Sequence, residues 1–148
     1  MVFCENARPL VLAVLLSTAL ATVASAGSTE PEMAIADVRP FVEAGIVTLR
    51  VRGNFDYDSV TRLGYPLAVV VEQDDTVAKM FLDGHVSTAT GGGPPTDVPD
   101  ARGVVSVQPT ELSVVLPAQI AVPGQGTTHL EATFDGDVLR SNKVRVSW

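Results

Sequence analysis

Cysteine is almost absent from this chain of 148 residues, because Cys4 is the only one. A protein with one thiol forms no internal disulfide, and it offers no set of cysteines for zinc. Basic side chains are also scarce: ten lysines and arginines stand against 17 aspartates and glutamates, and the net charge is −7. Nucleic-acid binding depends on clustered cations that release counterions, so this balance argues against a nucleic-acid partner.

The N-terminus has the pattern of an export signal. An apolar run from Leu10 to Val23 ends on Ala24-Ser25-Ala26, the small-x-small sequence that a signal peptidase accepts. Cleavage after Ala26 removes Cys4 with 26 of the 148 residues and leaves 122, beginning at Gly27. The run falls short of the ~20 apolar residues that a membrane-spanning helix needs. We therefore expect an exported bacterial protein, periplasmic or extracellular and at the cell surface, whose mature chain has no membrane span.

The rest of the chain is rich in short runs of β-branched residues. In Ile46–Gly53, Val47, Leu49 and Val51 alternate with polar residues, which predicts a strand with one buried face. No stretch beyond the signal shows helical periodicity over more than two turns. The pattern predicts a flexible lead-in over residues 27–33 and one all-β domain over 34–148. The expected strands include residues 46–53, 67–73, 76–82, 104–108, 111–116, 129–134 and 137–148.

Two long connections interrupt this pattern, at residues 54–66 and 84–103. The second contains Gly91-Gly92-Gly93-Pro94-Pro95, in which glycine freedom and proline ring constraint exclude regular structure. We expect both connections to be loops.

The C-terminal region predicts a β-hairpin. Leu130, Ala132 and Phe134 alternate with polar residues, and Asp135-Gly136 is a dipeptide that type I′ turns favour, since both central residues take positive φ. The stretch from Leu130 to Val146 resembles the closing hairpin of bacterial immunoglobulin-like and IPT/TIG-type domains, which carry a dGxxxxSNxVxV pattern. The resemblance covers about 17 residues. It implies a fold used mainly for binding, adhesion and spacing, and it transfers no site residues.

Strand spacing favours a single immunoglobulin-like antiparallel β-sandwich of seven or eight strands after a cleaved signal peptide. Several immunoglobulin hallmarks are missing: the chain has no cysteine pair, no tryptophan in the expected third strand and no tyrosine corner. The fold expectation therefore depends on strand spacing and the closing hairpin.

Connection 54–66 holds the candidate binding residues. It carries three aromatic side chains and two carboxylates within eleven positions, namely Phe55, Asp56, Tyr57, Asp58 and Tyr65. Tyrosine combines a large contact area with a low ordering cost, so loop tyrosines are typical of recognition surfaces. These side chains also suit a second role, in which they fold down and close the end of the sandwich. We expect the loop to share that end with the Asp135-Gly136 turn.

No metal or catalytic site is expected. The acids of Asn54-Phe55-Asp56-Tyr57-Asp58 begin like a calcium loop, but Ser59 and Tyr65 stand where an EF-hand needs Gly and Glu. An irregular calcium site at Asp56 and Asp58 and a solvated turn both stay open. His85 and His129 lack zinc-ligand spacing and are expected on the surface. A triad of Asp83, His85 and Ser87 is excluded because strand neighbours point to alternating faces.

The leading hypothesis is an exported, non-enzymatic module that binds a protein or a polysaccharide of the envelope or extracellular matrix. The alternative is a structural subunit of an envelope or cell-surface assembly, in which the lead-in pairs with a neighbour's edge strand. A small outer-membrane β-barrel and a small hydrolase rank lower. Most expected strands are shorter than the 9 to 11 residues of membrane barrels, and the sequence shows no nucleophile elbow or paired carboxylates.

Overall fold

The structure is a computed structural model that describes residues 32–64 and 66–148. The expected signal at 1–26 and residues 27–31 of the expected lead-in lie outside the described residues. The described residues belong to one compact unit. Within them, no helix combines the length and the apolar character needed to cross a membrane.

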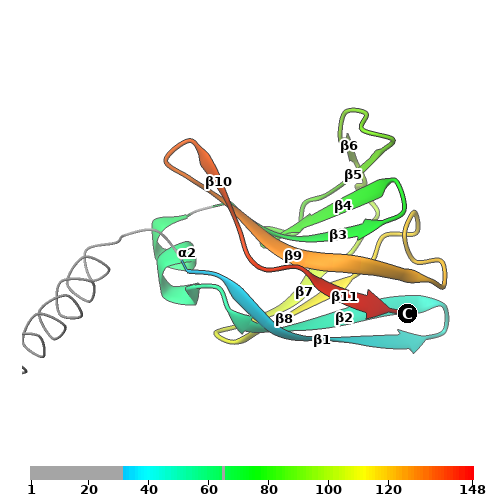
Figure 1. Cartoon of the computed structure of the whole chain (residues 1–148), viewed down its shortest axis with the longest axis horizontal. Helices are drawn as coiled ribbons and strands as arrows, with labels where there is room; N and C mark the ends of the chain where they lie inside the picture. Colours follow the sequence, from blue (N-terminus) through cyan, green and yellow to red (C-terminus); the bar gives the residue numbers. More distant parts are fainter. Residues whose placement is uncertain (1–31, 65) are drawn as a thin grey trace, which may run out of the picture. The chain divides into compact units, whose positions relative to one another are not determined.

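Two antiparallel sheets make up this unit (Figure 1). The four-stranded sheet A has the order β1-β2-β8-β7. Its strands are β1 (Ala34–Glu43), β2 (Ile46–Asn54), β7 (Gly103–Gln108) and β8 (Glu111–Val115). The seven-stranded sheet B has the order β10-β9-β3-β4-β5-β6, with β11 also paired to β9. Its strands are β3 (Leu67–Gln73), β4 (Thr76–Phe81), β5 (Val86–Thr90), β6 (Thr96–Asp97), β9 (Gln125–Phe134), β10 (Asp137–Arg140) and β11 (Val144–Ser147).

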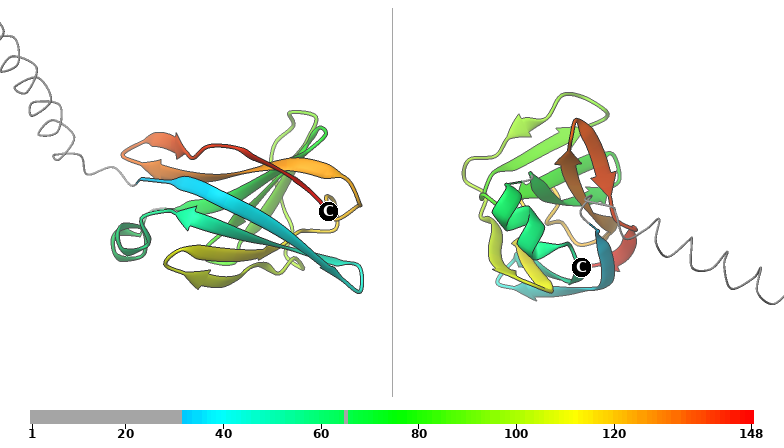
Figure 2. Two further views of the ribbon diagram at one scale, coloured as in Figure 1. Left: turned by 60° about the horizontal axis from the view of Figure 1, so that its bottom comes forward. Right: turned by 90° about the vertical axis from the view of Figure 1, so that its left-hand side faces the viewer.

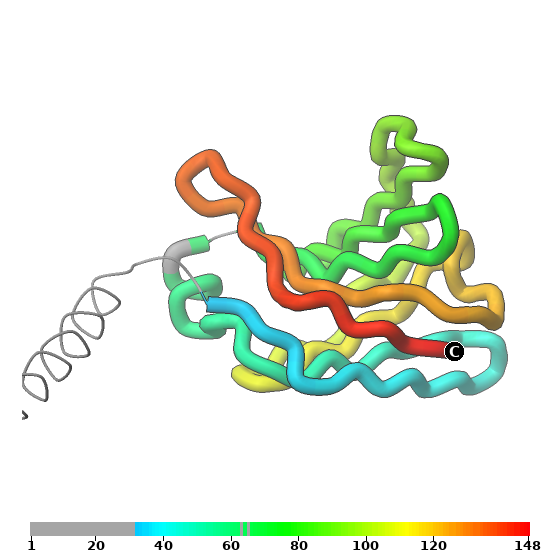
Figure 3. The backbone as a smooth tube through the Cα atoms, in the orientation of Figure 1, coloured from blue at the N-terminus to red at the C-terminus, as the bar shows by residue number. Residues whose placement is uncertain are grey.

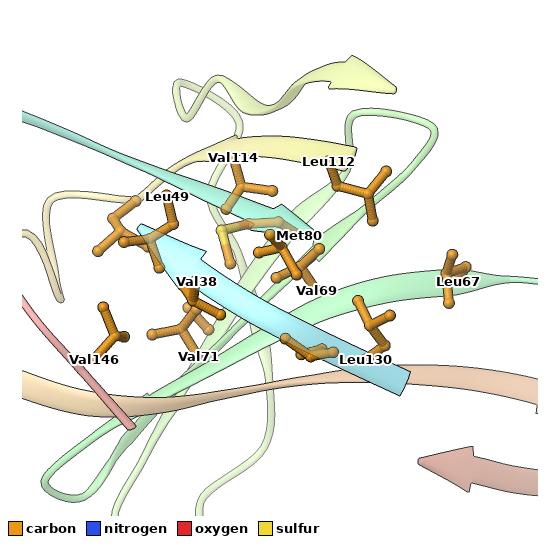
Figure 4. Close-up of a cluster of buried hydrophobic side chains, with 14 of the residues drawn as sticks. Val38, Leu49, Leu67, Val69, Val71, Met80, Leu112, Val114, Leu130 and Val146 are labelled. Carbon is orange, nitrogen blue, oxygen red and sulfur yellow. The ribbon is translucent and has the colours of Figure 1, made fainter. Parts of the chain in front are cut away.

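The hydrophobic core draws on both sheets. Alternation on β2 buries Val47, Leu49 and Val51, as the sequence predicts, and the run at β3 is buried on both faces. Because residues at every second position share a face, each strand sends one row of side chains into the core. Figure 4 shows these rows converging in one cluster, with labelled side chains Val38, Leu49, Val114 and Leu112 from sheet A and Leu67, Val69, Val71, Met80, Leu130 and Val146 from sheet B.

The all-β expectation is confirmed, but the described residues form eleven strands where seven or eight were expected. Part of the difference lies in connection 84–103, which was expected to be a loop. Residues 91–95 do lack regular structure, but Val86–Thr90 forms β5 and Thr96–Asp97 forms β6. The β-branched residues of Val86–Thr90 favour a strand, and this segment pairs with β4. The strand ends at Thr90, directly before the glycines that begin at Gly91.

The predicted C-terminal hairpin is confirmed at its turn. Asp135 and Gly136 have φ of 51° and 82°, the two positive values that a type I′ turn requires. The expected single strand from Asp137 to the end is wrong, because it divides into β10 and β11 around residues 141–143. Figure 3 shows both segments following β9.

Asn142 explains this interruption. Its Oδ1 accepts the Ile35 amide at 2.7 Å, and its Nδ2 donates to the Ile35 carbonyl at 2.9 Å. The neighbouring Ser141 Oγ accepts the Leu130 amide at 2.8 Å. These side-chain hydrogen bonds replace the backbone hydrogen bonds that would continue the strand. Residues 141–143 therefore leave sheet B at this point and connect it to β1.

Candidate functional site

Connection 54–66, expected to be a loop, contains a short helix, α2 (Tyr57–Leu63). The Val60 amide donates to the Asp56 carbonyl at 2.9 Å, and the Gly64 amide donates to the Val60 carbonyl at 3.0 Å. Gly64 has φ 71°, the left-handed conformation that commonly ends a helix. Two helical turns are too short for a clear periodic signal, which is why the sequence pattern did not predict α2.

Phe55 does not belong to the exposed surface. Its side chain is 1% exposed and packs in the core cluster with Val60, one turn into α2. Of the two roles that the sequence allowed for these aromatics, Phe55 takes the structural one. It anchors the start of α2 and cannot contact a partner while the fold is intact.

The other predicted binding residues have different positions. Tyr57 is half-buried, and its ring meets Phe55 edge-on, with centroids 6.0 Å apart and planes at 77°. Asp58 is exposed in the first turn of α2, whereas Asp56 precedes the helix in a left-handed conformation with φ 52°. Tyr65 lies outside the described residues. The described part of the set thus runs from a buried anchor at Phe55 to an exposed acid at Asp58.

The helix α2 and the β9–β10 turn lie at the same end of the two sheets, as expected. Figure 2 shows this in its right-hand view, where α2 and the orange hairpin both face the reader. Five carboxylates lie on three segments of this end, namely α2 with the residue before it, the turn after β4 and the β9–β10 turn, and Arg62 is the cation of α2; the carboxylates are Asp56, Asp58, Asp83, Asp135 and Asp137. We call this region the α2 end.

A pocket of about 400 Å³ opens beside α2. Val60 and Thr61 of the helix form one wall, and Phe81, Leu82 and Asp83 at the end of β4 form the other. The remaining lining residues, between α2 and β3, are Gly64, Pro66 and Leu67. The pocket combines apolar walls with a hydroxyl and a carboxylate at its edge, which is the usual make-up of a small recognition site.

The β4–β5 connection positions the far wall of this pocket. Asp83 Oδ1 accepts the His85 amide at 2.8 Å, and the Phe81 and His85 rings pack with centroids 5.6 Å apart. The His85 ring points its Nε2 at Asp97 Oδ1, 3.1 Å away. Because the Asp83 carboxylate accepts the backbone amide of His85 and does not contact its ring, the hydrogen bond stabilises the turn after β4. This turn therefore holds the far wall of the pocket in place.

The two histidines differ in burial. His85 is exposed as expected, but the expectation of a surface position for His129 is wrong, since that side chain is only 3% exposed. The His129 Nε2 lies 3.6 Å from Glu131 Oε2. Within residues 32–64 and 66–148, no three His, Cys, Asp or Glu side chains gather as a metal site. Calcium binding at Asp56 and Asp58 stays a prediction.

Sequence reasoning missed the far wall of the pocket. Phe81 and Asp83 are some twenty positions from α2 in the chain, and only the pairing of β3 with β4 brings them beside Thr61. A signal for Asp83 existed in the Asp-Gly dipeptide at 83–84, which indicates a turn, although nothing in the sequence indicates which element that turn faces.

No family model matches the chain, and neither the curated proteins nor the solved structures contain a match to it.

Proposed function

We propose that the protein is an exported, non-enzymatic binding or adhesion module with an immunoglobulin-like β-sandwich fold. Its α2 end recognises a protein or a polysaccharide of the envelope or extracellular matrix. The observation that carries this proposal is the pocket between Thr61 on α2 and Asp83 after β4.

The support comes from how this pocket is built. One wall stands on a helix fastened by the buried Phe55 and Val60, and the other on a turn braced by the Asp83–His85 hydrogen bond. Binding sites commonly consist of connecting segments held by a rigid framework, because such segments vary freely while the framework sets their positions. The pocket offers Phe81 as an apolar contact and Asp83 as a hydrogen-bond acceptor.

The test is affinity capture with the purified protein, using the envelope and secreted fractions of the producing cell. The wild type is compared with a variant that carries Asp58→Ala, Thr61→Ala and Asp83→Ala. A matched control carries Gln108→Ala on β7. A protein or polysaccharide that the wild type and the control retain, but the α2-end variant loses, supports the proposal. A partner retained equally by all three proteins contradicts it, provided thermal unfolding shows that the variants are folded.

A further inference from the structure

Three cations stand in a row along one edge of sheet B. Leu130 and Ala132 of β9 face the core, so the outward face of this strand carries Thr127, His129 and Glu131. Arg140 on β10 lies opposite Glu131, and Arg145 on β11 lies opposite Thr127. Lys143 directly precedes β11 and so comes between the two arginines. We call Arg140, Lys143 and Arg145 the cationic ladder.

Strand geometry sets the spacing of this ladder. Outward positions on a strand repeat every two residues, at about 6.8 Å. Directly opposite residues in an antiparallel pair share a face. Arg140, Lys143 and Arg145 therefore follow the edge of β9 as a line of charges, spread over strands, and do not surround a pocket.

Nearby carboxylates neutralise only part of this charge. Glu131 Oε1 accepts Lys79 Nζ at 2.7 Å, and Glu131 Oε2 is 3.3 Å from Arg140 Nε, so one carboxylate serves two cations. Glu72 Oε1 lies 3.7 Å from Lys143 Nζ. Counting Lys79, the outward face of sheet B holds four cations and three carboxylates, the third being Asp97 of β6, and Arg145 lies outside these ion pairs.

His129 lies under this face as a neutral group. Neither ring nitrogen has a hydrogen-bond partner among the residues that the structure describes, and Nε2 is 3.6 Å from Glu131 Oε2. Burial lowers the pKa of His129 and the charge of Lys143 adds to this, while Glu131 and Glu72 act in the opposite direction. The ring therefore fills space beneath the ion pairs at neutral pH and brings no charge of its own.

The remainder of the molecule has the opposite charge balance. Without Arg8, Glu5 and Glu30, the described residues hold nine cations and 15 carboxylates. Four of those cations and three of those carboxylates belong to the outward face of sheet B, which leaves five cations and 12 carboxylates elsewhere. An anion that approaches this acidic molecule is attracted to one face and repelled from most of the others.

The surroundings of the ladder narrow the class of anion. Apart from the buried His129 and the two glutamates already described, the outward neighbours on β3 and β9 are small or aliphatic, among them Ala68, Val70 and Thr127. Single-stranded nucleic acid is held by aromatic platforms, and protein interfaces centre on aromatic anchors. The described outward face offers one aromatic ring, Phe81, which lies on β4, two strands from β9. A row of exposed cations without such anchors suits a linear polyanion bound through its charges.

We propose that the cationic ladder binds an acidic polysaccharide, with the carboxylates or sulfates of successive sugars pairing with Arg140, Lys143 and Arg145. This site shares no residue with the α2 end. Binding at the ladder can therefore be tested independently of the proposed function.

The test measures the affinity of the purified protein for oligomers of polygalacturonate and of dextran sulfate at low ionic strength. A triple variant with Arg140→Gln, Lys143→Gln and Arg145→Gln removes the ladder. The matched control removes three arginines from the outward face of sheet A, Arg39→Gln, Arg50→Gln and Arg52→Gln. These control arginines face Asp37, Phe41 and Glu111. Arg145→Gln alone is a milder variant that breaks no ion pair within the described part of the chain.

We expect the ladder variant to lose about tenfold or more in affinity, because three exposed charge pairs contribute modest amounts that add up. The control should bind nearly as the wild type does, and added salt should weaken wild-type binding. Arg145→Gln should show a smaller loss in the same direction.

Three results would overturn the proposal. Equal losses in both triple variants would mean that net charge and not the ladder attracts the polymer. Polyglutamate or single-stranded DNA binding as tightly as the glycans would remove the assignment to polysaccharide. Absence of binding to either glycan at low ionic strength would remove the site itself.

Discussion

The α2 end and the cationic ladder differ in how they present their chemistry. At the α2 end, segments distant in the sequence enclose a pocket of about 400 Å³, and carboxylates outnumber cations. At the ladder, one hairpin and its extension place cations on the outward face of sheet B, along β9. The α2 end presents a pocket with defined walls, whereas the ladder presents a row of positive charges. An acidic protein can thus still have a cationic surface when strand register brings its few basic side chains together.

The two regions also depend on different interactions. Two buried apolar side chains, Phe55 and Val60, hold α2 against the core. Backbone register with β9 holds the ladder, and Asn142 fastens its middle to β1. Mutations should therefore separate the regions by the size of their effect on folding stability.

The largest effect should come from Phe55→Ala. Removing a fully buried aromatic side chain typically costs about 3–5 kcal/mol of unfolding free energy, since it leaves a cavity in the core. Tyr57→Ala is the matched control, because this ring is only half-buried beside Phe55, and it should cost clearly less. Chemical denaturation of both variants measures the difference, and equal costs would mean that Phe55 is not the anchor of the α2 end.

Asn142→Ala should have the next largest effect. It removes both hydrogen bonds to Ile35 and leaves backbone groups of β1 without their partners, at a cost of about 1–3 kcal/mol. Asn54→Ala removes one exposed bond, to the Asp56 amide, and should cost less. Amide hydrogen exchange at Ile35 should accelerate in the Asn142 variant only. Unchanged exchange there would show that Asn142 does not join the ladder to β1.

Acid should destabilise the ladder region through His129. The pKa of His129 in the folded protein lies below its usual 6.5, mainly because the ring is buried. Between that lower pKa and 6.5 the unfolded chain holds more protons, so folding stability is full above pH 6.5 and declines as the pH falls.

Glu131 extends this acid sensitivity to lower pH. Burial by itself raises its pKa, but Lys79 and Arg140 outweigh burial and hold it below the usual 4.5, so its contribution to stability is lost below about that pH. His129→Gln should flatten the decline that begins as the pH falls below 6.5 and leave the decline below about pH 4.5 that Glu131 causes. Denaturation at a series of pH values measures both, and an unchanged decline just below pH 6.5 would assign that decline to other groups.

The smallest stability effect should come from Arg145→Gln. The side chain is exposed and forms no ion pair with residues 32–64 or 66–148, so its replacement should change the unfolding free energy by less than about 0.5 kcal/mol. The same variant should weaken binding to polygalacturonate. A loss of binding with unchanged stability would separate a contact role from a structural one, whereas a large loss of stability would show that Arg145 supports the sheet.

Sequence reasoning identified the strands better than the sites. Alternation at Ile46–Gly53 and the Asp135-Gly136 dipeptide predicted a strand and a turn correctly, because both signals are local. The helix α2 was missed because two turns carry little periodicity. The sequence left the burial of Phe55 open, because an aromatic residue in a loop gives the same sequence pattern whether its side chain faces the core or the solvent.

The sequence also did not predict that the cations of the ladder share one face. Arg140 and Arg145 were both expected on one continuous strand, where an odd separation would place them on opposite faces. Asn142 breaks that strand, and the separate pairing of β10 and β11 with β9 brings both arginines to the outward side. A register change of this kind depends on the contact with Ile35, more than a hundred positions away in the chain.

The most direct test of two separate surfaces is a titration of the isotope-labelled protein with a polygalacturonate oligomer, followed by amide chemical shifts. We predict shifts confined to residues 140–145 and the facing part of β9, with the amides of α2 and residues 81–85 unmoved. Shifts at α2, with none along β10 and β11, would contradict the proposal that the ladder binds acidic polysaccharides. They would place polygalacturonate binding at the α2 end.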